Sequence, residues 1–220
     1  MRPKCFERNV KPGPSSILAV VTIVALTLLH FPANANEKYA AAIKAHQNGD
    51  SETALVLLKE LANSGHIGAQ THLGTLYEHG RVVSKDDKKA YDWYRKAAGN
   101  GGIVAQHKLA RLYEDGIGVD QDLRAARLWY TNSALAAEAE GLKRAASFSQ
   151  YRLALLFLTD KGGEKNVPRA YALAQLASNN GLDQAQALAA EIQATMSTAE
   201  LTEAEELIQQ LSTTDYSLFE

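Results

Sequence analysis

AQTHLGTLYEHGRVVSKDDKKAYDWYRKAAGNG, residues 69–101, returns thirty-six residues later as AQHKLARLYEDGIGVDQDLRAARLWYTNSALAA, residues 105–137. A fixed period of this length is typical of structural units that each bury one face against a neighbour. The positions that carry the repeat in the first unit are Leu73, Gly74, Tyr77, Gly80, Trp93, Tyr94 and Gly101. In the second unit Leu109, Tyr113, Gly116, Trp129 and Tyr130 answer Leu73, Tyr77, Gly80, Trp93 and Tyr94, and Gly118 is a further structural position. The sequence therefore predicts a stack of units rather than one closed core.

The repeat continues on both sides of these two units. Upstream, residues 37–68 match the second half of a unit, which predicts a leading half-unit. Downstream, the offset grows to forty-four, because eight extra residues fall between Trp129 and Leu153. These extra residues are rich in Ala, Glu, Lys and Arg, and we expect them to lengthen a helix pair with a solvated face. The predicted full units are residues 69–104, 105–148 and 149–184.

Each full unit reads as two helices joined by a short turn. Apolar residues recur at spacings of three and four, as one face of a helix requires. Gly80 and Gly116 then end the first helix, because glycine enters the left-handed cap position without steric cost. Asp86 and Asp122 are placed to cap the second helix, and Asn166 takes this position in the third unit.

The fold class that follows is all-α, an α-solenoid of antiparallel helix pairs over residues 36–196, followed by a C-terminal capping helix, residues 197–211. Ser197 and Glu200 form a capping-box signal at its start. Residues 212–220 are expected to form a tail. The apolar stripe that would shield the last repeat is Leu201, Ala204, Ile208 and Leu211.

Trp93 and Trp129 allow two interpretations, because aromatic side chains fill cores and also mark binding sites. Both occupy the same phase of the repeat, beside Tyr94 and Tyr130. This shared phase favours packing in the core over a ligand site.

The run Ala-x3-Leu-Gly-x2-Tyr-x2-Gly, followed by Val-x2-Asp-x2-Lys-Ala-x2-Trp-Tyr-x-Lys-Ala-Ala-x2-Gly, extends from Ala69 to Gly101. It resembles the Sel-one-like repeat family, cousins of the tetratricopeptide repeats, and the resemblance covers about residues 50–186. The chain departs from the pattern at Val82, where the second unit has Gly118, and at Leu173, which replaces the tryptophan of the third unit. The resemblance implies an α-solenoid that serves as an adaptor or scaffold in protein complexes, often in bacterial envelopes.

The N-terminal segment predicts export. Four basic residues precede an apolar run over residues 17–31, and the small-x-small triplet Ala33-Asn34-Ala35 follows it. The run is shorter than the ~20 residues that a membrane-spanning helix needs. We therefore expect residues 1–35 to be a signal peptide cleaved near Ala35, without stable membrane insertion afterwards. The alternative is a retained membrane anchor.

Charge and cysteine content exclude several classes of partner. The predicted mature chain carries 19 basic and 24 acidic residues, which disfavours nucleic acid and anionic lipid as ligands. Cys5 is the only cysteine and lies in the predicted signal peptide. The mature chain is thus expected to fold without disulfides and to carry no thiol chemistry.

The sequence contains no specific catalytic or cofactor motif, so no enzyme activity and no cofactor are predicted. The spacing of His66, His72, His79 and His107 does not place two of them at metal-ligand geometry on one helical face, and no metal site is expected. Glu78 and Glu114 are in phase across adjacent units and could face one another. Paired carboxylates hydrolyse glycosidic bonds, although the repeat itself explains the pairing.

By analogy with tetratricopeptide-like stacks, the first helices line a concave face that holds a partner. In this candidate partner groove the residues of the first two units are polar and those of the third unit are apolar. Such a groove suits a mixed-charge peptide or helix with an apolar end. The alternative is that the chain's own C-terminus covers the apolar end. The groove residues in this analogy are Thr71, Thr75, Glu78, His79, His107, Arg111, Glu114, Asp115, Tyr151, Leu155 and Leu158.

Three functional hypotheses follow from the sequence. The first is a non-enzymatic periplasmic or secreted adaptor or scaffold that binds another protein of the cell envelope through the concave face. The second is a cell-wall glycan binder or hydrolase-like protein that uses Glu78 and Glu114. The third is a secreted host-interaction factor.

Overall fold

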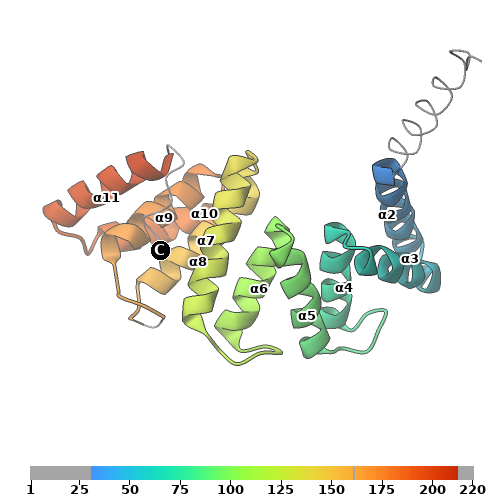
Figure 1. The fold of residues 1–220 in the computed structure, drawn as a ribbon. Helices are drawn as coiled ribbons and strands as arrows, with labels where there is room; N and C mark the ends of the chain where they lie inside the picture. The colour runs from blue at the N-terminus through green and yellow to red at the C-terminus, as the bar shows by residue number, and fades with distance from the viewer. Residues whose placement is uncertain (1–30, 161, 213–220) are drawn as a thin grey trace, which may run out of the picture.

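The computed structural model describes residues 31–160 and 162–212, and this part of the chain is all α-helical. The helices pack against their neighbours in chain order and form one stacked array (Figure 1). The predicted α-solenoid is therefore confirmed. The helices are α2 (Phe31–Gln47), α3 (Ser51–Asn63), α4 (Ile67–His79), α5 (Asp87–Gly99), α6 (Ile103–Asp115), α7 (Leu123–Ala139), α8 (Lys143–Phe157), α9 (Val167–Asn179), α10 (Asp183–Gln193) and α11 (Thr198–Ser212).

Three full units are formed by the pairs α4/α5, α6/α7 and α8/α9. We call α4, α6 and α8 the first helices of these units and α5, α7 and α9 the second helices. The leading half-unit is in fact a helix pair, because α2 packs on α3 through a short turn at residues 48–50. The sequence match found only its second half, because α2 has no counterpart of the Tyr-x2-Gly motif that ends α4 and α6.

The helix ends follow the predicted chemistry. Gly80 and Gly116 occupy the left-handed region at the C-caps of α4 and α6, with φ of 67° and 68°. Asp86 accepts a hydrogen bond from the backbone N–H of Lys89, and Asn166 accepts one from Arg169 in the third unit. Asp122 caps α7 in the same way. The predicted caps are confirmed, and they fix where each second helix begins.

Tyr94 and Tyr130 are fully buried at the centres of their units, whereas Trp93 and Trp129 are partly buried at the edges of the apolar clusters. Trp129 packs against two clusters and so links the second unit to the third. The first and second helices approach closely at Gly74, where a Cβ atom would lie 2.6 Å from the Tyr94 ring. The tryptophans do pack, but the tyrosines are the deepest aromatic side chains.

The eight extra residues are divided between two helices. α7 runs four residues further than α5 does in its unit, and α8 begins four residues earlier than α6. The turn between α7 and α8, residues 140–142, keeps the length of residues 100–102. The predicted lengthened helix pair is thus confirmed.

The turns inside the second and third units contact the first residues of the second helix of the unit before them. A Cβ atom on Gly118 would overlap the carbonyl of Asp87 at the start of α5, and one on Gly162 would meet Leu123 at the start of α7. Val82, at the same position of the first unit, instead packs against the apolar cluster of α3 and α4. A side chain fits at Val82 because the helix pair α2/α3, which precedes the first unit, differs from a full unit.

The C-terminal helices close the array. α10 and α11 both pack against α9 (Figure 1). The capping box at the start of α11 is present, since Ser197 N–H donates to Glu200 Oε2 at 2.8 Å and Glu200 N–H donates to Ser197 Oγ at 3.3 Å. The buried residues of α11 are Ala204, Leu207 and Leu211, and they cover the second helices rather than the first.

Two predicted features lie outside the described residues, namely residues 1–30 of the predicted signal peptide and residues 213–220 of the tail. Within residues 31–160 and 162–212, no helix combines the length and the apolar character that crossing a membrane requires. The predicted cleavage point after Ala35 falls inside α2. The contacts of Asn36, Lys38 and Ala42 with the rest of the array lie beyond that point.

Candidate partner groove on the first helices

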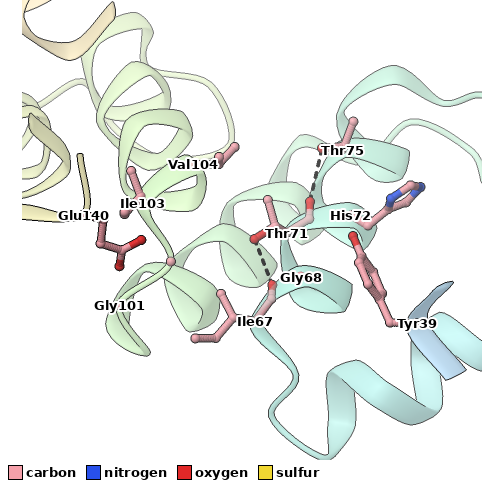
Figure 2. Close-up of a pocket in the computed structure, with 11 residues that line it drawn as sticks. Tyr39, Ile67, Gly68, Thr71, His72, Thr75, Gly101, Ile103, Val104 and Glu140 are labelled. Atoms are coloured by element: carbon pink, nitrogen blue, oxygen red, sulfur yellow. Dashed lines mark hydrogen bonds between the residues drawn. The ribbon is translucent and has the colours of Figure 1, made fainter. Parts of the chain in front are cut away.

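A cavity of about 480 Å³ opens across α2, α4 and α6. Figure 2 shows its lining, with Tyr39 and His72 on one side and Ile103, Val104 and Glu140 on the other. Between them lie Thr71 and Thr75, whose hydroxyl groups donate to the backbone carbonyls four residues earlier. Because these hydroxyl groups are satisfied within α4, the surface that they leave is largely apolar.

A second cavity, of about 390 Å³, lies between α6, α7 and the start of α8. The two cavities share Ile103 and Val104 in their linings and therefore adjoin, and we call the two together the groove. The second cavity, which we call the α6–α8 pocket, is lined by Ile103, Val104, His107, Ser133, Arg144, Ala145 and Phe148.

The apolar character of the groove comes from three side chains near the starts of the first helices. Ile67 is 38% exposed, Val104 is 57% exposed and Phe148 is 39% exposed. Val104 and Phe148 occupy the same position of successive units, immediately before Ala105 and Ser149. A row of exposed apolar side chains in a hollow is typical of a binding surface.

The structure divides the residues predicted for the groove into three sets. Thr71, Thr75 and His107 line the groove. His79 and Asp115 are exposed at the C-terminal ends of α4 and α6, away from both cavities. The side chains that pair with one another or are partly buried beside the core are Glu78, Arg111, Glu114, Tyr151, Leu155 and Leu158.

The apolar side chains that line the two cavities lie earlier in the chain than the predicted Tyr151, Leu155 and Leu158. Leu158 packs against the apolar cluster that includes Ala189 and Ile192 of α10. Tyr151 and Leu155 remain partly buried. Ile67, Val104 and Phe148 were missed because they precede the helix positions from which the analogy was drawn.

Glu78 and Glu114 tie successive units together. Glu78 accepts hydrogen bonds from Tyr94 of its own unit at 2.6 Å and from Arg111 of the next first helix. Lys108 also pairs with Glu78, at 3.4 Å.

Glu114 repeats this arrangement one unit later. It accepts from the Tyr130 hydroxyl group at 2.8 Å and pairs with Arg152 of α8 at 2.6 Å. Burial, reinforced by the Glu114 carboxylate, raises the pKa of Tyr130 above its usual range. Each carboxylate is thus bound to its own tyrosine and cation, and the arrangement is that of a structural tie rather than a catalytic carboxylate pair.

The histidines that were considered as metal ligands have separate roles. His66 caps α4, because its Nδ1 accepts the backbone N–H of Ala69 at 3.1 Å. His72 packs edge-on against His46, with ring centroids 5.3 Å apart. In the described ranges, no three His, Cys, Asp or Glu side chains come together as metal ligands would.

His107 is the one histidine in the α6–α8 pocket. Its Nδ1 lies 2.9 Å from the hydroxyl group of Ser149, which in turn donates to Ser133 Oγ at 3.0 Å. Burial, together with the positive charges of Lys108 and Arg152, lowers the pKa of His107 to about 4. The ring is therefore neutral at physiological pH.

This lowered pKa predicts a loss of stability in mild acid. Between pH ~6.5 and pH ~4 the unfolded chain binds a proton on His107 that the folded chain does not, so stability falls as pH falls. We expect the loss attributable to His107 to be at most ~1.4 kcal/mol per pH unit. Urea unfolding of wild type and His107→Gln between pH 7.5 and pH 4.8 measures it. The wild-type advantage should shrink toward low pH, and a constant difference would contradict the prediction.

Three segments match the sequence profile of the Sel1 repeat, namely residues 67–102, 103–137 and 147–182. They correspond to the three full units of the array, and the gap between the second and third contains the extension of α7 and α8. The chain belongs to the Sel1 repeat family. Sel1 repeats generally mediate protein–protein interaction, and the family is generally non-catalytic. The search of curated proteins returned no match.

A solved Sel1 repeat structure has the same architecture. The crystal structure of a Sel1 repeat protein from Oxalobacter formigenes is 26% identical, with a TM-score of 0.60 over 69% of this chain and 59% of the other. A second match is c5321, described as a protective antigen present in uropathogenic Escherichia coli strains displaying an SLR fold. It is 21% identical, with a TM-score of 0.45 over 83% of this chain and 46% of the other. This Sel1 repeat protein therefore spans about three-fifths and under half of their lengths, respectively.

Proposed function

We propose that this Sel1 repeat protein is a non-enzymatic adaptor or scaffold that holds a segment of another cell-envelope protein in the groove. The observation that carries the proposal is the row of Ile67, Val104 and Phe148, which stay exposed while two adjoining cavities surround them. Burying such side chains against a partner stabilises a complex by roughly 25 cal/mol for each Å² of apolar surface. An extended or helical segment with apolar anchors suits a groove of this kind.

Export to the periplasm or the outside of the cell is the second part of the proposal. It is supported by the basic and apolar segments before Ala35 and by the small-x-small triplet that ends there. Cleavage after Ala35 leaves Lys38, which pairs with Glu60, and Tyr39, which lines the groove. Intact mass of the protein recovered from the periplasm and from the medium tests this part, since an exported chain should begin at Asn36. A chain that keeps Met1 and fractionates with the cytoplasm would refute it.

The position of Val104 in the groove predicts that a charged residue there weakens partner binding. Val104→Asp places a carboxylate among apolar side chains, where desolvation makes a buried charge costly. We expect at least a tenfold loss of co-purified partner, which corresponds to about 1.4 kcal/mol. The assay is affinity capture from envelope extracts, with the partner quantified by mass spectrometry.

Leu128→Asp is the matched control for this experiment. Leu128 is 53% exposed, close to the value of Val104, but it lies on the second helix α7 and outside the groove. It should leave partner recovery unchanged. Equal losses from both variants, with both proteins folded, would show that the groove is not the binding surface.

A further inference from the structure

The α6–α8 pocket is built by the part of the chain that departs from the repeat. Arg144 and Ala145 lie in the extra turn at the start of α8, and Phe148 follows one turn later. The pocket surface is apolar except where His107, Ser133 and Arg144 reach it. The extra residues were expected to present a solvated face. Lys143 and Arg144 are exposed, and Arg144 and Ala145 also form one wall of a cavity.

Two buried serines beneath this pocket also break the repeat. Ser133 and Ser149 are fully buried, whereas the matching positions of the preceding unit are Ala97 and Ala105. Burying a hydroxyl group costs free energy unless it is hydrogen-bonded. Both hydroxyl groups are bonded here, and the chain of bonds that they form ends at His107.

This chain of bonds fixes the tautomer of His107. The carbonyl of Ile103 can only accept, so Ser133 donates its single proton there, at 3.1 Å. Ser133 must then accept from Ser149, which uses the one proton of that hydroxyl group. Ser149 therefore accepts from Nδ1–H of His107. The proton is on Nδ1, and Nε2 carries a lone pair.

Nε2 is a hydrogen-bond acceptor without a partner in the described part of the chain, on a ring that lines an apolar pocket. Because burial keeps the pKa of His107 near 4, Nε2 stays an acceptor throughout the physiological range. An aliphatic side chain in this pocket would leave the acceptor desolvated and unpaired, which is unfavourable. A group that is apolar over most of its surface and carries one N–H or O–H donor matches the pocket.

This inference rests on the proposed function. We propose that the partner inserts a tryptophan or tyrosine side chain into the α6–α8 pocket. The indole N–H or phenol O–H of that side chain then donates to Nε2 of His107. Val104 and Phe148 supply the apolar walls, and Arg144, which also lines the pocket, offers a guanidinium to the aromatic face. Tryptophan, tyrosine and arginine are also the side chains that dominate interface energies.

The test uses the purified full chain with indole and 1-methylindole, which differ in the N–H donor. Long-range ¹H–¹⁵N NMR spectra of the His107 ring should show the Nδ1–H tautomer. Indole should bind about two- to tenfold more tightly than 1-methylindole, as one hydrogen bond allows. An Nε2–H tautomer, or equal binding of the two probes, would overturn the inference.

Two variants separate the hydrogen bond from packing. His107→Phe keeps an aromatic ring but removes the acceptor, so the preference for indole should disappear. Ser149→Ala restores the alanine of the preceding unit, which that unit accommodates, and should release the tautomer and weaken the preference. A preference that survives in His107→Phe would assign it to another group.

The peptide captured at the groove distinguishes this inference from the proposed function. Mass spectrometry of the segment cross-linked to a probe at Val104 should find a tryptophan or tyrosine within it. A discrete segment with only aliphatic anchors would refute the aromatic anchor and leave the adaptor function standing. Failure to capture any discrete segment would count against both.

Discussion

Tyr130→Ala is expected to lower the free energy of unfolding by about 4 kcal/mol, in the range found for removing a fully buried aromatic side chain. Tyr130 is fully buried where α6, α7 and α8 meet, and its hydroxyl group donates to Glu114, which also pairs with Arg152. The substitution removes apolar contacts and one member of a tie between two units. Urea unfolding followed by circular dichroism measures the loss.

Trp129→Ala and Tyr130→Phe are the comparison variants for the loss of stability in Tyr130→Ala. Trp129 is only partly buried, so its removal should cost less, about 2–3 kcal/mol. Tyr130→Phe keeps the ring and loses one hydrogen bond to a carboxylate, about 1.5–3 kcal/mol. A larger loss from Trp129→Ala than from Tyr130→Ala would mean that the tryptophan is the centre of the unit.

Gly118→Ala should lower the free energy of unfolding by about 3 kcal/mol. Gly118 has a φ of 71°, which costs an L-residue ~1–2 kcal/mol, and the added Cβ would overlap the backbone of Asp87 and Lys88. The overlap is with backbone atoms, so no side chain can move aside to relieve it. Thermal and urea unfolding of the variant measure the effect.

Gly141→Ala separates the two causes of this loss. Gly141 has a φ of 69°, but a Cβ atom there would meet no heavy atom within 4 Å. Its replacement should cost only the backbone term, about 1–2 kcal/mol. If both variants lose the same stability, the close contact between the α6–α7 turn and α5 contributes nothing.

The sequence was sufficient for the features that depend on local chemistry. Gly116 at a helix end, Asp122 at a helix start and the capping box at Ser197 each follow from backbone conformation and hydrogen bonding within a few residues. The division of the eight extra residues between α7 and α8 was not predicted, because the predicted boundary at residue 148 assigned all of them to the second unit, whereas α8 begins at Lys143.

Features that depend on contacts between units could not be predicted in the same way. Glu114 looked like a free carboxylate in phase with Glu78, because the cation that binds it comes from Arg152 on the next first helix, thirty-eight residues later. The depth of Tyr130 relative to Trp129 likewise depends on where the third unit packs. Periodicity identifies equivalent positions but not their partners.

The analogy missed the exposed apolar residues of the groove for a related reason. Its positions in each first helix began two residues before the repeated leucine, whereas Ile67, Val104 and Phe148 lie further toward the start of the helix. One signal for the α6–α8 pocket was present in the sequence. Serines replace alanines at Ser133 and Ser149, and a polar residue at a buried repeat position requires a partner.

Site-specific photo-crosslinking in living cells tests the central claim, that the groove holds a protein partner, most directly. The probe is placed at Val104, with His107 as a second groove position and Leu128 on α7 as the control. Mass spectrometry then identifies what is captured. We predict one discrete envelope protein, captured from Val104 and His107 and not from Leu128. Equal capture from all three positions, or glycan adducts without a protein, would contradict the account.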